Sequence, residues 1–332
     1  MTMSGPYPRI DSVERFGKVA VLMGGDSAER EISLMSGQAV LESLVRNGVD
    51  AHPVDAADDP LSALSRDRFD RVWLTLHGRG GEDGTVQGLL TMMKMPFTGS
   101  DVLGCAISMD KLRTKRLLAG MGIDTPAYCE VSGEHEFESV IGMLGLPMIV
   151  KPAAEGSSLG MTRVEQAEQL ADAYLEAARF RSQVFAEAWV SGPEFTATVL
   201  HDQVLPLIRI DATNSFYDYE AKYFSDETRY ICPCGLPEHQ ERLLAQACMD
   251  AFNAVGASGW GRVDFMLADD GAPLILEVNT TPGMTTHSLV PMAAAEAGID
   301  FDELTWRILE TSFTERRSGP NEFPAAESSH GA

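Results

Sequence analysis

Short apolar runs that end at glycines alternate with amphipathic stretches in the first part of the chain. The runs KVAVLMGG (18–25) and RVWLTLHG (71–78) have the composition of buried strands, and another strand is expected near Ala51 to Val54. Between them, SLMSGQAVLESLVRNG (33–48) has helical spacing and ends at a glycine. This order predicts a parallel sheet with crossover helices, and therefore an α/β layer. Ligands of such sheets bind at the carboxyl ends of the strands, where GGDSAERE and HGRGGEDG lie.

Strands outnumber helices after about residue 110. The expected strands are LPMIVKP (146–152), VFAEAWV (184–190) and FTATVL (195–200), then VLPLIRI, RYICP, GRVDFML and LILEVN. Helices are expected at DKLRTKRLLAGMG, which begins near an Asp cap, and over 238–255. Because hairpins are expected among so many short strands, this part is predicted to be antiparallel α+β.

The balance of charge excludes some classes of partner. With 26 basic and 49 acidic residues, the chain has a net charge of −23, and nucleic acid phosphates would repel it. We therefore expect no nucleic acid partner. No run of 18 apolar residues predicts a membrane span, and the first residues lack the order of a signal peptide. The five cysteines form no CxxC pair and are expected to be free thiols, so a cytoplasmic location is predicted.

A loop of small residues follows the strand that ends near Lys151. In KPAAEGSSLGM (151–161), Gly and Ser leave backbone N–H groups open to anionic oxygens, and Lys151 adds a positive charge. An ordinary turn is the alternative. The segment also contains GSSLG (156–160), the GxSxG pattern of serine hydrolases. That pattern requires a helix directly after the serine, whereas MTRVEQ predicts a short strand.

Asp264, Glu277 and Asn279 are predicted to share one face of a hairpin. Two apolar runs flank the turn sequence ADDGAP, and Glu277 and Asn279 occupy alternate positions of the second run. Oxygen ligands without imidazole or thiolate favour Mg²⁺ that bridges substrate phosphates. Arg262 shares this face. Solvated charges on an exposed sheet face are the alternative, but the neighbouring residues are nearly all apolar, Gly or Pro.

Other candidate residues have two interpretations each. His77 ends a buried strand at a glycine loop and is either a half-buried structural histidine or part of a site. Glu187 is either a carboxylate at the rim of a site or a neighbour of the core. The segment SFYDYEAKYFSDET (215–228) is either a surface excursion or a lid, from which Lys222 and Tyr223 would reach inward.

Eight segments together resemble the D-alanine–D-alanine ligase family of the ATP-grasp superfamily. They occur in family order over about residues 18–312: GGDSAEREISLMSG, LHGRGGEDGTVQGLL, FTGSDVLGCAISMDK, IVKPAAEGSSLGM, SGPEFTATVL, FYDYEAKY, GWGRVDFML and EVNTTPGMTTHSLVPMAA. Each segment alone is modest support, but eight in register are very specific.

The resemblance implies an α/β N-terminal domain with a parallel sheet, followed by two α+β ATP-grasp domains. The expected boundaries are 1–110 for the N-terminal domain, 111–194 for the central ATP-grasp subdomain and 195–315 for the C-terminal ATP-grasp domain. The composition of 316–332 predicts a disordered tail.

The resemblance also implies the reaction. ATP would convert the carboxylate of one D-alanine into an acyl phosphate, and the amine of a second D-alanine would attack it. The products would be D-alanyl-D-alanine for peptidoglycan synthesis, ADP and phosphate. ATP as a substrate and two Mg²⁺ ions, or Mn²⁺, are the expected cofactors, and a homodimer is usual in the family.

The family's site residues are carried to matching positions. The implied nucleotide contacts are Lys111, Lys151 and Lys222 at the phosphates, Glu187, Trp189 and Val190 at the adenine, and Glu194 at the ribose. Asp264, Glu277 and Asn279 would hold the metal ions. The implied substrate and catalytic residues are Glu29 and His77 at the first D-alanine, a Glu29–Ser157–Tyr223 triad that closes the lid, Arg262 and the Gly283 N–H at the oxyanion, and Ser288 with Leu289 at the second carboxylate.

Alternatives remain at this point. A ligase that makes D-Ala–D-lactate or D-Ala–D-Ser would share the fold; Tyr223 is the form associated with D-alanine, whereas phenylalanine there goes with D-lactate. Ala188 stands where many members of the family carry Lys, so one adenine contact is in doubt. A GxSxG serine hydrolase would use Ser158. An inactive scaffold that only binds nucleotide would not need Arg262.

Overall fold

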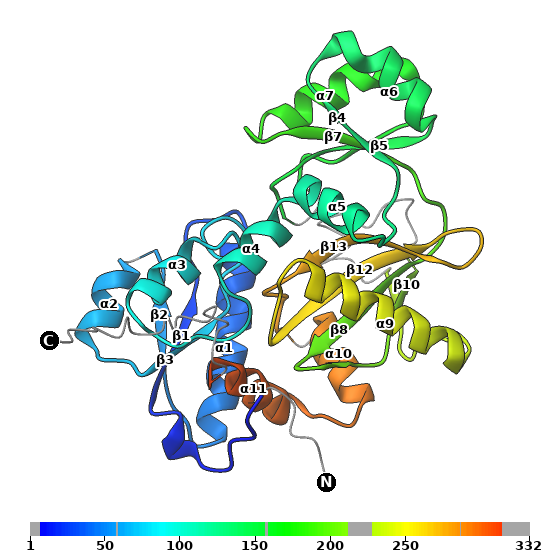
Figure 1. Ribbon diagram of the computed structural model, residues 1–332. Helices are drawn as coiled ribbons and strands as arrows, with labels where there is room; N and C mark the ends of the chain where they lie inside the picture. The colour runs from blue at the N-terminus through cyan, green and yellow to red at the C-terminus, as the bar shows by residue number, and fades with distance from the viewer. Residues whose placement is uncertain (1–6, 58, 157–158, 212–227, 286, 314–332) are drawn as a thin grey trace, which may run out of the picture.

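The structure is a computed structural model that describes residues 7–57, 59–156, 159–211, 228–285 and 287–313. It contains one parallel sheet and two antiparallel sheets, each with its own helices (Figure 1). The mixed α/β class expected from the sequence is therefore confirmed. No helix in the described ranges is long and apolar enough to span a membrane, and the five cysteines are free thiols, as predicted.

The first sheet is parallel, with the strand order β2-β1-β3. Its strands are β1 (Lys18–Met23), β2 (Asp50–Asp55) and β3 (Arg71–Leu74), and its helices are α1 (Arg30–Arg46), α2 (Pro60–Arg66), α3 (Thr85–Met92) and α4 (Val102–Met109). The apolar centre of β1 has no exposed surface, as expected for a strand covered by helices on both faces.

Two boundaries in this layer differ from the prediction. The strand predicted over 71–78 ends at Leu74, and the helix predicted over 33–48 begins at Arg30. Gly78 has a φ of +69°, a left-handed conformation that does not continue a strand. Residues 75–78 therefore form a loop that follows the carboxyl end of β3.

The second sheet is antiparallel, with the order β4-β7-β5-β6. Its strands are β4 (Tyr128–Val131), β5 (Met148–Pro152), β6 (Thr162–Val164) and β7 (Val184–Ala188), and α6 (Phe137–Leu144) and α7 (Leu170–Ala178) cover one face (Figure 1). The strand predicted from MTRVEQ is confirmed as β6. Because a strand and not a helix follows the glycine- and serine-rich segment, the serine hydrolase alternative is not supported.

The third sheet is also antiparallel, with the order β11-β10-β8-β12-β13 and with β9 paired to β8. Its strands are β8 (Glu194–Leu200), β9 (Gln203–Val204), β10 (Ile208–Asp211), β11 (Arg229–Ile231), β12 (Trp260–Leu267) and β13 (Pro273–Asn279), and α9 (Glu238–Ala254) packs on one face. The predicted hairpin is confirmed as β12–β13. The single strand predicted at VLPLIRI is wrong: Pro206, which has no N–H to donate to a ladder, separates β9 from β10.

Helix α5 (Lys111–Gly120) lies between the second and third sheets (Figure 1). It begins, as predicted, at an aspartate cap: Asp110 accepts a hydrogen bond from the backbone N–H of Arg113 at 2.9 Å. Two further helices, α10 (Leu289–Glu296) and α11 (Phe301–Glu310), follow β13, and short 3₁₀ turns lie at Val13–Arg15, Glu134–Glu136, Ala167–Gln169 and Thr311–Phe313.

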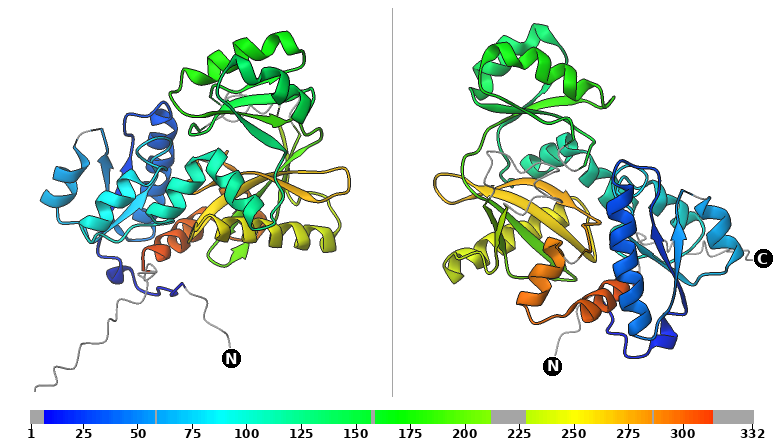
Figure 2. Two further views of the ribbon diagram at one scale, coloured as in Figure 1. Left: turned by 45° about the horizontal axis from the view of Figure 1, so that its top comes forward. Right: turned by 180° about the vertical axis from the view of Figure 1, so that it is seen from behind.

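The last helix, α11, returns to the first sheet and packs beside α1 (Figure 2). Leu304, Ile308 and Leu309 of α11 are fully buried in one apolar cluster with Val40 and Leu44 of α1. At the edge of this contact, Asp302 pairs with Arg46 at 2.6 Å. Segments from both ends of the chain therefore share one core.

Candidate active site

The acidic hairpin face forms as predicted. In the β12–β13 ladder Asp264 pairs with Glu277 and Arg262 pairs with Asn279. Asp264 is 2% exposed, and Arg262 donates two hydrogen bonds to its carboxylate, from Nε at 2.8 Å and Nη2 at 2.7 Å. Asn279 Nδ2 donates another at 3.0 Å, which leaves the amide oxygen of Asn279 as a third hard donor beside the two carboxylates.

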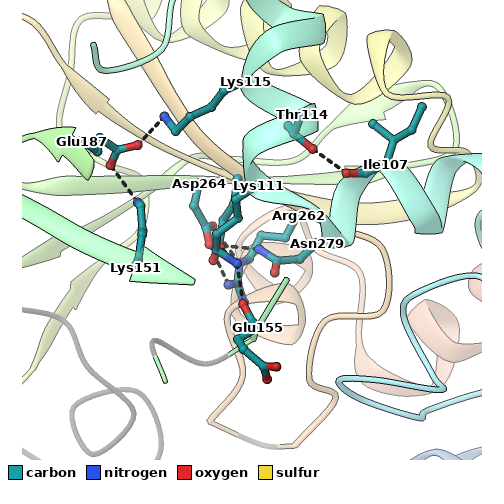
Figure 3. A network of polar contacts seen from close by, with 11 residues as sticks. Ile107, Lys111, Thr114, Lys115, Lys151, Glu155, Glu187, Arg262, Asp264 and Asn279 are labelled. Atoms are coloured by element: carbon teal, nitrogen blue, oxygen red, sulfur yellow. Dashed lines mark hydrogen bonds and ion pairs between the residues drawn. The ribbon is translucent and has the colours of Figure 1, made fainter. Parts of the chain in front are cut away.

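Lys111 connects this hairpin to the glycine- and serine-rich loop. Its Nζ lies 2.9 Å from Glu277 Oε2 and donates to the carbonyl of Glu155 at 2.8 Å. The backbone N–H of Lys111 also donates to the carbonyl of Ala153. The first turn of α5 therefore links the loop, through the contact of Lys111 with Glu155 (Figure 3), to the carboxylate of Glu277 on β13.

Glu187 is buried between two lysines and does not lie at an exposed rim. It is 3% exposed, and its Oε1 accepts from Lys151 Nζ at 2.8 Å, while Oε2 pairs with Lys115 Nζ (Figure 3). Burial opposes the charge of Glu187, but the attraction of Lys115 and then of Lys151 outweighs it, so the pKa of this carboxyl lies below its ordinary value.

Lys115 is a site residue that the sequence analysis missed. It stands four residues after Lys111, on a helix where a lysine is normally expected to face solvent, yet its side chain has no exposed surface. Burial lowers its pKa to about 8. The i, i+4 spacing from Lys111 was the available signal, because residues at this spacing share a helix face.

A second acidic cluster lies where the loops after β1 and β3 meet the loop after β5. Glu29 is 6% exposed, and a Cβ added to Gly78 or Gly156 would lie only 2.8 or 2.9 Å from its Oε2. Both loops therefore approach Glu29 as closely as glycine allows. The loop after β5 carries Ser157 two residues past Glu155, but Ser157 lies outside the described residues, as do Lys222 and Tyr223.

His77 and Glu82 lie beside Glu29. His77 is 5% exposed, and its Nε2 has no hydrogen-bond partner among the described residues. Burial lowers the pKa of His77, although the charge of Glu29 works in the opposite direction. Glu82, which the sequence analysis did not single out, accepts from the Gly78 N–H at 2.6 Å. Burial and then the negative charge of Glu29 raise its pKa to about 8, so the surroundings of Glu82 favour its neutral form.

The predicted carboxylate-binding residues lie at the start of α10. Ser288 is the N-cap and Leu289 the first residue of this helix. Ser288 Oγ accepts from the Thr285 N–H at 2.9 Å, and a Cβ on Gly283 would lie 3.0 Å from the same oxygen. The backbone of Gly283 and the Ser288 hydroxyl are therefore close neighbours, and the positive end of the helix dipole is adjacent.

Trp189 and Val190 follow β7, and Glu194 begins β8. All three side chains are partly buried. The guanidinium of Arg163 lies 4.2 Å from the centre of the Trp189 ring, a cation–π contact that fixes the indole at the edge of the second sheet. These residues form the connection between the second and third sheets.

Two cavities bear on where a ligand could bind. One of 170 Å³ is lined by His77 and the glycine loops after β1 and β3. Another, of 840 Å³, lies at residues 7–11, the β8–β9 turn and α11, and none of the predicted site residues line it. The chemistry of the side chains therefore indicates the hairpin and glycine loops as the site, although the larger cavity is elsewhere.

Lysines and hard oxygen ligands around a glycine-rich loop are the parts that phosphoryl-transfer enzymes use. The fold and site therefore define a phosphate-handling, nucleotide-dependent class of enzyme. Comparison with known proteins identifies the family within that class. Family models described as the D-ala D-ala ligase N-terminus and C-terminus match residues 55–100 and 117–310. The chain belongs to the D-alanine–D-alanine ligase family.

Individual relatives agree with this assignment. A D-alanine–D-alanine ligase of Nitrosococcus oceani is 54% identical over 308 residues, which cover 93% of this chain and 97% of the relative. The solved structure of a Bacillus anthracis D-alanine–D-alanine ligase complexed with ATP has a TM-score of 0.78 at 34% identity and covers 89% of this chain and 96% of its own. The VanG D-Ala:D-Ser ligase of Enterococcus faecalis has a TM-score of 0.75 at 27% identity, covering 89% and 99%.

Proposed function

We propose that this protein uses ATP to join two D-alanine molecules into D-alanyl-D-alanine, through a D-alanyl phosphate, and releases ADP and phosphate. The observation that carries the proposal is the contact of Lys111 with both Glu277 and the glycine-rich loop. It brings a cation, hard oxygen ligands and the glycine-rich loop to one place, a combination that supports transfer of a γ-phosphoryl group. Family membership supports the choice of substrates.

In this proposal two ATP-grasp domains, over 111–194 and 195–315, hold ATP between the second and third sheets. Lys111 and Lys151 bind the phosphates, Glu187, Trp189 and Val190 contact the adenine, and Glu194 contacts the ribose. Lys222 would join the phosphate contacts from the segment outside the described residues. The position of α5 between the two sheets supports this arrangement.

Asp264, Glu277 and Asn279 would hold Mg²⁺. Their donors are hard oxygens on adjacent strands, the type that Mg²⁺ prefers. Arg262 and Lys111 pair with the two carboxylates, so each acid already lies in a cationic environment that also suits phosphate. The bound ions would offset phosphate charge and polarise the transferred group.

Glu29 would bind the ammonium of the first D-alanine, and His77, whose Nε2 has no hydrogen-bond partner in the part of the chain that the structure describes, would contact the same substrate. Arg262 and the Gly283 N–H would stabilise the oxyanion that forms when the second amine attacks. The carboxylate of the second D-alanine would bind at Ser288 and Leu289, at the start of α10, where the positive end of the helix dipole favours an anion. A triad of Glu29, Ser157 and Tyr223 would close the lid and exclude water from the acyl phosphate.

The wider setting is also part of the proposal. The dipeptide would supply peptidoglycan precursor synthesis in the cytoplasm, and the enzyme would act as a homodimer. A D-Ala–D-Ser or D-Ala–D-lactate ligase is the second candidate, because the VanG structure has the same fold. The 54% identity to a D-alanine–D-alanine ligase favours the first.

ADP and dipeptide formation with ATP, Mg²⁺ and D-alanine tests the proposal. We expect D-alanine-dependent ADP release and D-alanyl-D-alanine by mass spectrometry, with L-alanine inactive. Parallel reactions that add D-serine or D-lactate to D-alanine test the second candidate. Absence of ADP with every acceptor would contradict both.

A further inference from the structure

Lys115 is a charged side chain enclosed on all sides. Its Nζ donates to Thr125 Oγ1 and pairs with Glu187 Oε2, and it lies 5.6 Å from the centre of the Tyr128 ring. Thr125 Oγ1 donates in turn to the carbonyl of Ile275 on β13 at 2.8 Å. Lys115 therefore contacts residues of the second sheet directly and is linked to the third sheet through Thr125 (Figure 3 shows its contact with Glu187).

Burying a lysine in this way is unfavourable unless its charge is needed. Glu187 has a partner without it, because Lys151 Nζ lies 2.8 Å from the other carboxylate oxygen. One carboxylate with two buried lysines is an excess of positive charge, and burial accordingly lowers the pKa of Lys115 to about 8. The pairing of Glu187 alone does not explain the second lysine.

The second buried lysine is explained if Lys151 must exchange Glu187 for another partner. Under the proposed function, on which this inference rests, Lys151 binds ATP phosphates. To do so it must share or release its contact with Glu187, and a buried carboxylate left without a partner is strongly unfavourable. Lys115 supplies the partner that remains.

We propose that Lys115 is a positioning residue that retains Glu187, so that Lys151 is available to the phosphates of the nucleotide. Lys115 itself need not touch ATP. Its effect would be on nucleotide binding and not on the D-alanine subsites, which lie at Glu29 and at the start of α10.

Lys115→Met removes the ammonium and keeps an unbranched apolar side chain of similar length. We expect the KM for ATP to rise by about tenfold or more, because Lys151 is then the one ion-pair partner of Glu187 among the described residues and is held there. The kcat and the KM for D-alanine should stay within about threefold of wild type. Arg116→Met is the matched control: it removes a cation from the next position of α5, where the side chain is 51% exposed, and should leave all three constants unchanged.

A second substitution separates positioning from mere packing. Glu187→Gln keeps a hydrogen-bond acceptor but no longer holds Lys151 by charge. In the double variant Lys115→Met with Glu187→Gln, we expect the KM for ATP to lie within about threefold of the Glu187→Gln value. A packing role for Lys115 would instead make the two effects multiply.

Calorimetric titration with ATP, without D-alanine, compares the ATP affinities of wild type and the variants even if the protein shows no turnover. It therefore distinguishes failure of this inference from failure of the proposed function. Lys115→Gln, which can still hydrogen-bond Thr125 and Glu187, replaces Lys115→Met if thermal unfolding shows that the latter does not fold. A folded Lys115 variant with wild-type ATP affinity, or multiplying effects in the double variant, would overturn the inference.

Discussion

At the scale of single residues, the two carboxylates on the site face of the hairpin, Asp264 and Glu277, each have a cationic partner. Arg262 holds Asp264 in a two-point contact, and Lys111 pairs with Glu277. Such an ion pair can bind an anion and a metal ion together. The cation of the pair can contact a phosphate group while the carboxylate contacts a metal ion. Under the proposed function, replacing one acid would therefore change both metal binding and the position of its cationic partner.

Glu277→Gln should lower kcat by at least about a hundredfold, because an amide binds Mg²⁺ more weakly and no longer attracts Lys111. ADP release across a range of Mg²⁺ concentrations measures the effect. Asp269→Asn, at the exposed turn of the same hairpin, is the control and should retain full activity. A Glu277→Gln enzyme with near-normal turnover would contradict the assignment of the metal site.

Glu82 predicts a dependence of stability on pH. The folded protein keeps a proton on Glu82 up to a pKa of about 8, whereas the ordinary value is 4.5. Folded protein thus binds more protons than unfolded chain between these values, and the stability from this proton is lost as pH rises through the interval. Glu82→Gln removes the titration.

The difference in melting temperature between Glu82→Gln and wild type should therefore be near zero at pH 5. It should increase in favour of the variant as the pH rises to 9. Melting curves at several pH values measure this. Glu31→Gln, an exposed substitution on α1, should run parallel to wild type. A constant offset for Glu82→Gln would show that Glu82 does not hold the proton.

The sequence was most informative where side chains repeat with the period of a strand or a helix. Alternation predicts that Arg262 and Asp264 share a face of β12 and that Glu277 and Asn279 share a face of β13. The register shift next to Asp264, which places Glu277 opposite it, could not be predicted from alternation. Helical spacing places Lys115 on the same face as Lys111, but the burial of Lys115 and of Glu82 could not be predicted in this way, because it results from contacts with distant segments. A lysine in a polar helix and a glutamate in a glycine loop are expected at the surface.

At the scale of elements, the hairpin depends on a close approach at Gly261. A Cβ there would lie 2.6 Å from the carbonyl oxygen of Asn279 and 2.6 Å from the Phe252 ring. Such contacts are far inside van der Waals distance, so β12 must move away from either β13 or α9. The position of Arg262 follows that of Gly261.

Gly261→Ala should destabilise the protein by about 1–3 kcal/mol and lower activity through displacement of Arg262. Gly142→Ala is the matched control, because a Cβ there meets nothing within 4 Å and lies in α6. That change should be neutral or stabilise by about 0.5–1 kcal/mol. Urea unfolding of the two variants gives the comparison, and equal effects would contradict it.

Most elements could be predicted from apolar runs and glycine stops, but their exact ends could not. Helix α1 begins at Arg30 and β3 ends at Leu74, and in both cases the loop that makes the difference carries site residues. Glu29 and His77 lie in these loops. The backbone there is shaped by contacts with other parts of the site and not by local propensity.

At the scale of the whole molecule, α11 packs against α1, which lies more than 250 residues earlier in the sequence. Leu304 is fully buried in the cluster that contains Val40 and Leu44. Contacts between segments so far apart in sequence cannot be inferred from periodicity, nor can the position of β8 between β10 and β12. The order of strands in the third sheet is determined by tertiary packing and not by local sequence pattern.

Leu304→Ala should cost about 2–5 kcal/mol and should lower the melting temperature of the first and third sheets together, because both contribute to this core. Hydrogen exchange in β1 and in β8 reports the two sheets separately. Leu243→Ala, at a side chain that is 70% exposed, should change stability by less than about 0.5 kcal/mol. Loss of protection in one sheet alone would contradict a shared core.

The two lysines of α5 have a consequence for inhibitors and for adaptation. Lys111 contacts the metal-ligand candidate Glu277, and Lys115, one turn later on the same rigid helix, contacts Glu187. A substitution or a compound that tilts this helix would shift both contacts at the same time. Under the proposed function, a substitution that weakens binding of a nucleotide-like inhibitor by moving α5 would therefore weaken the binding of ATP as well.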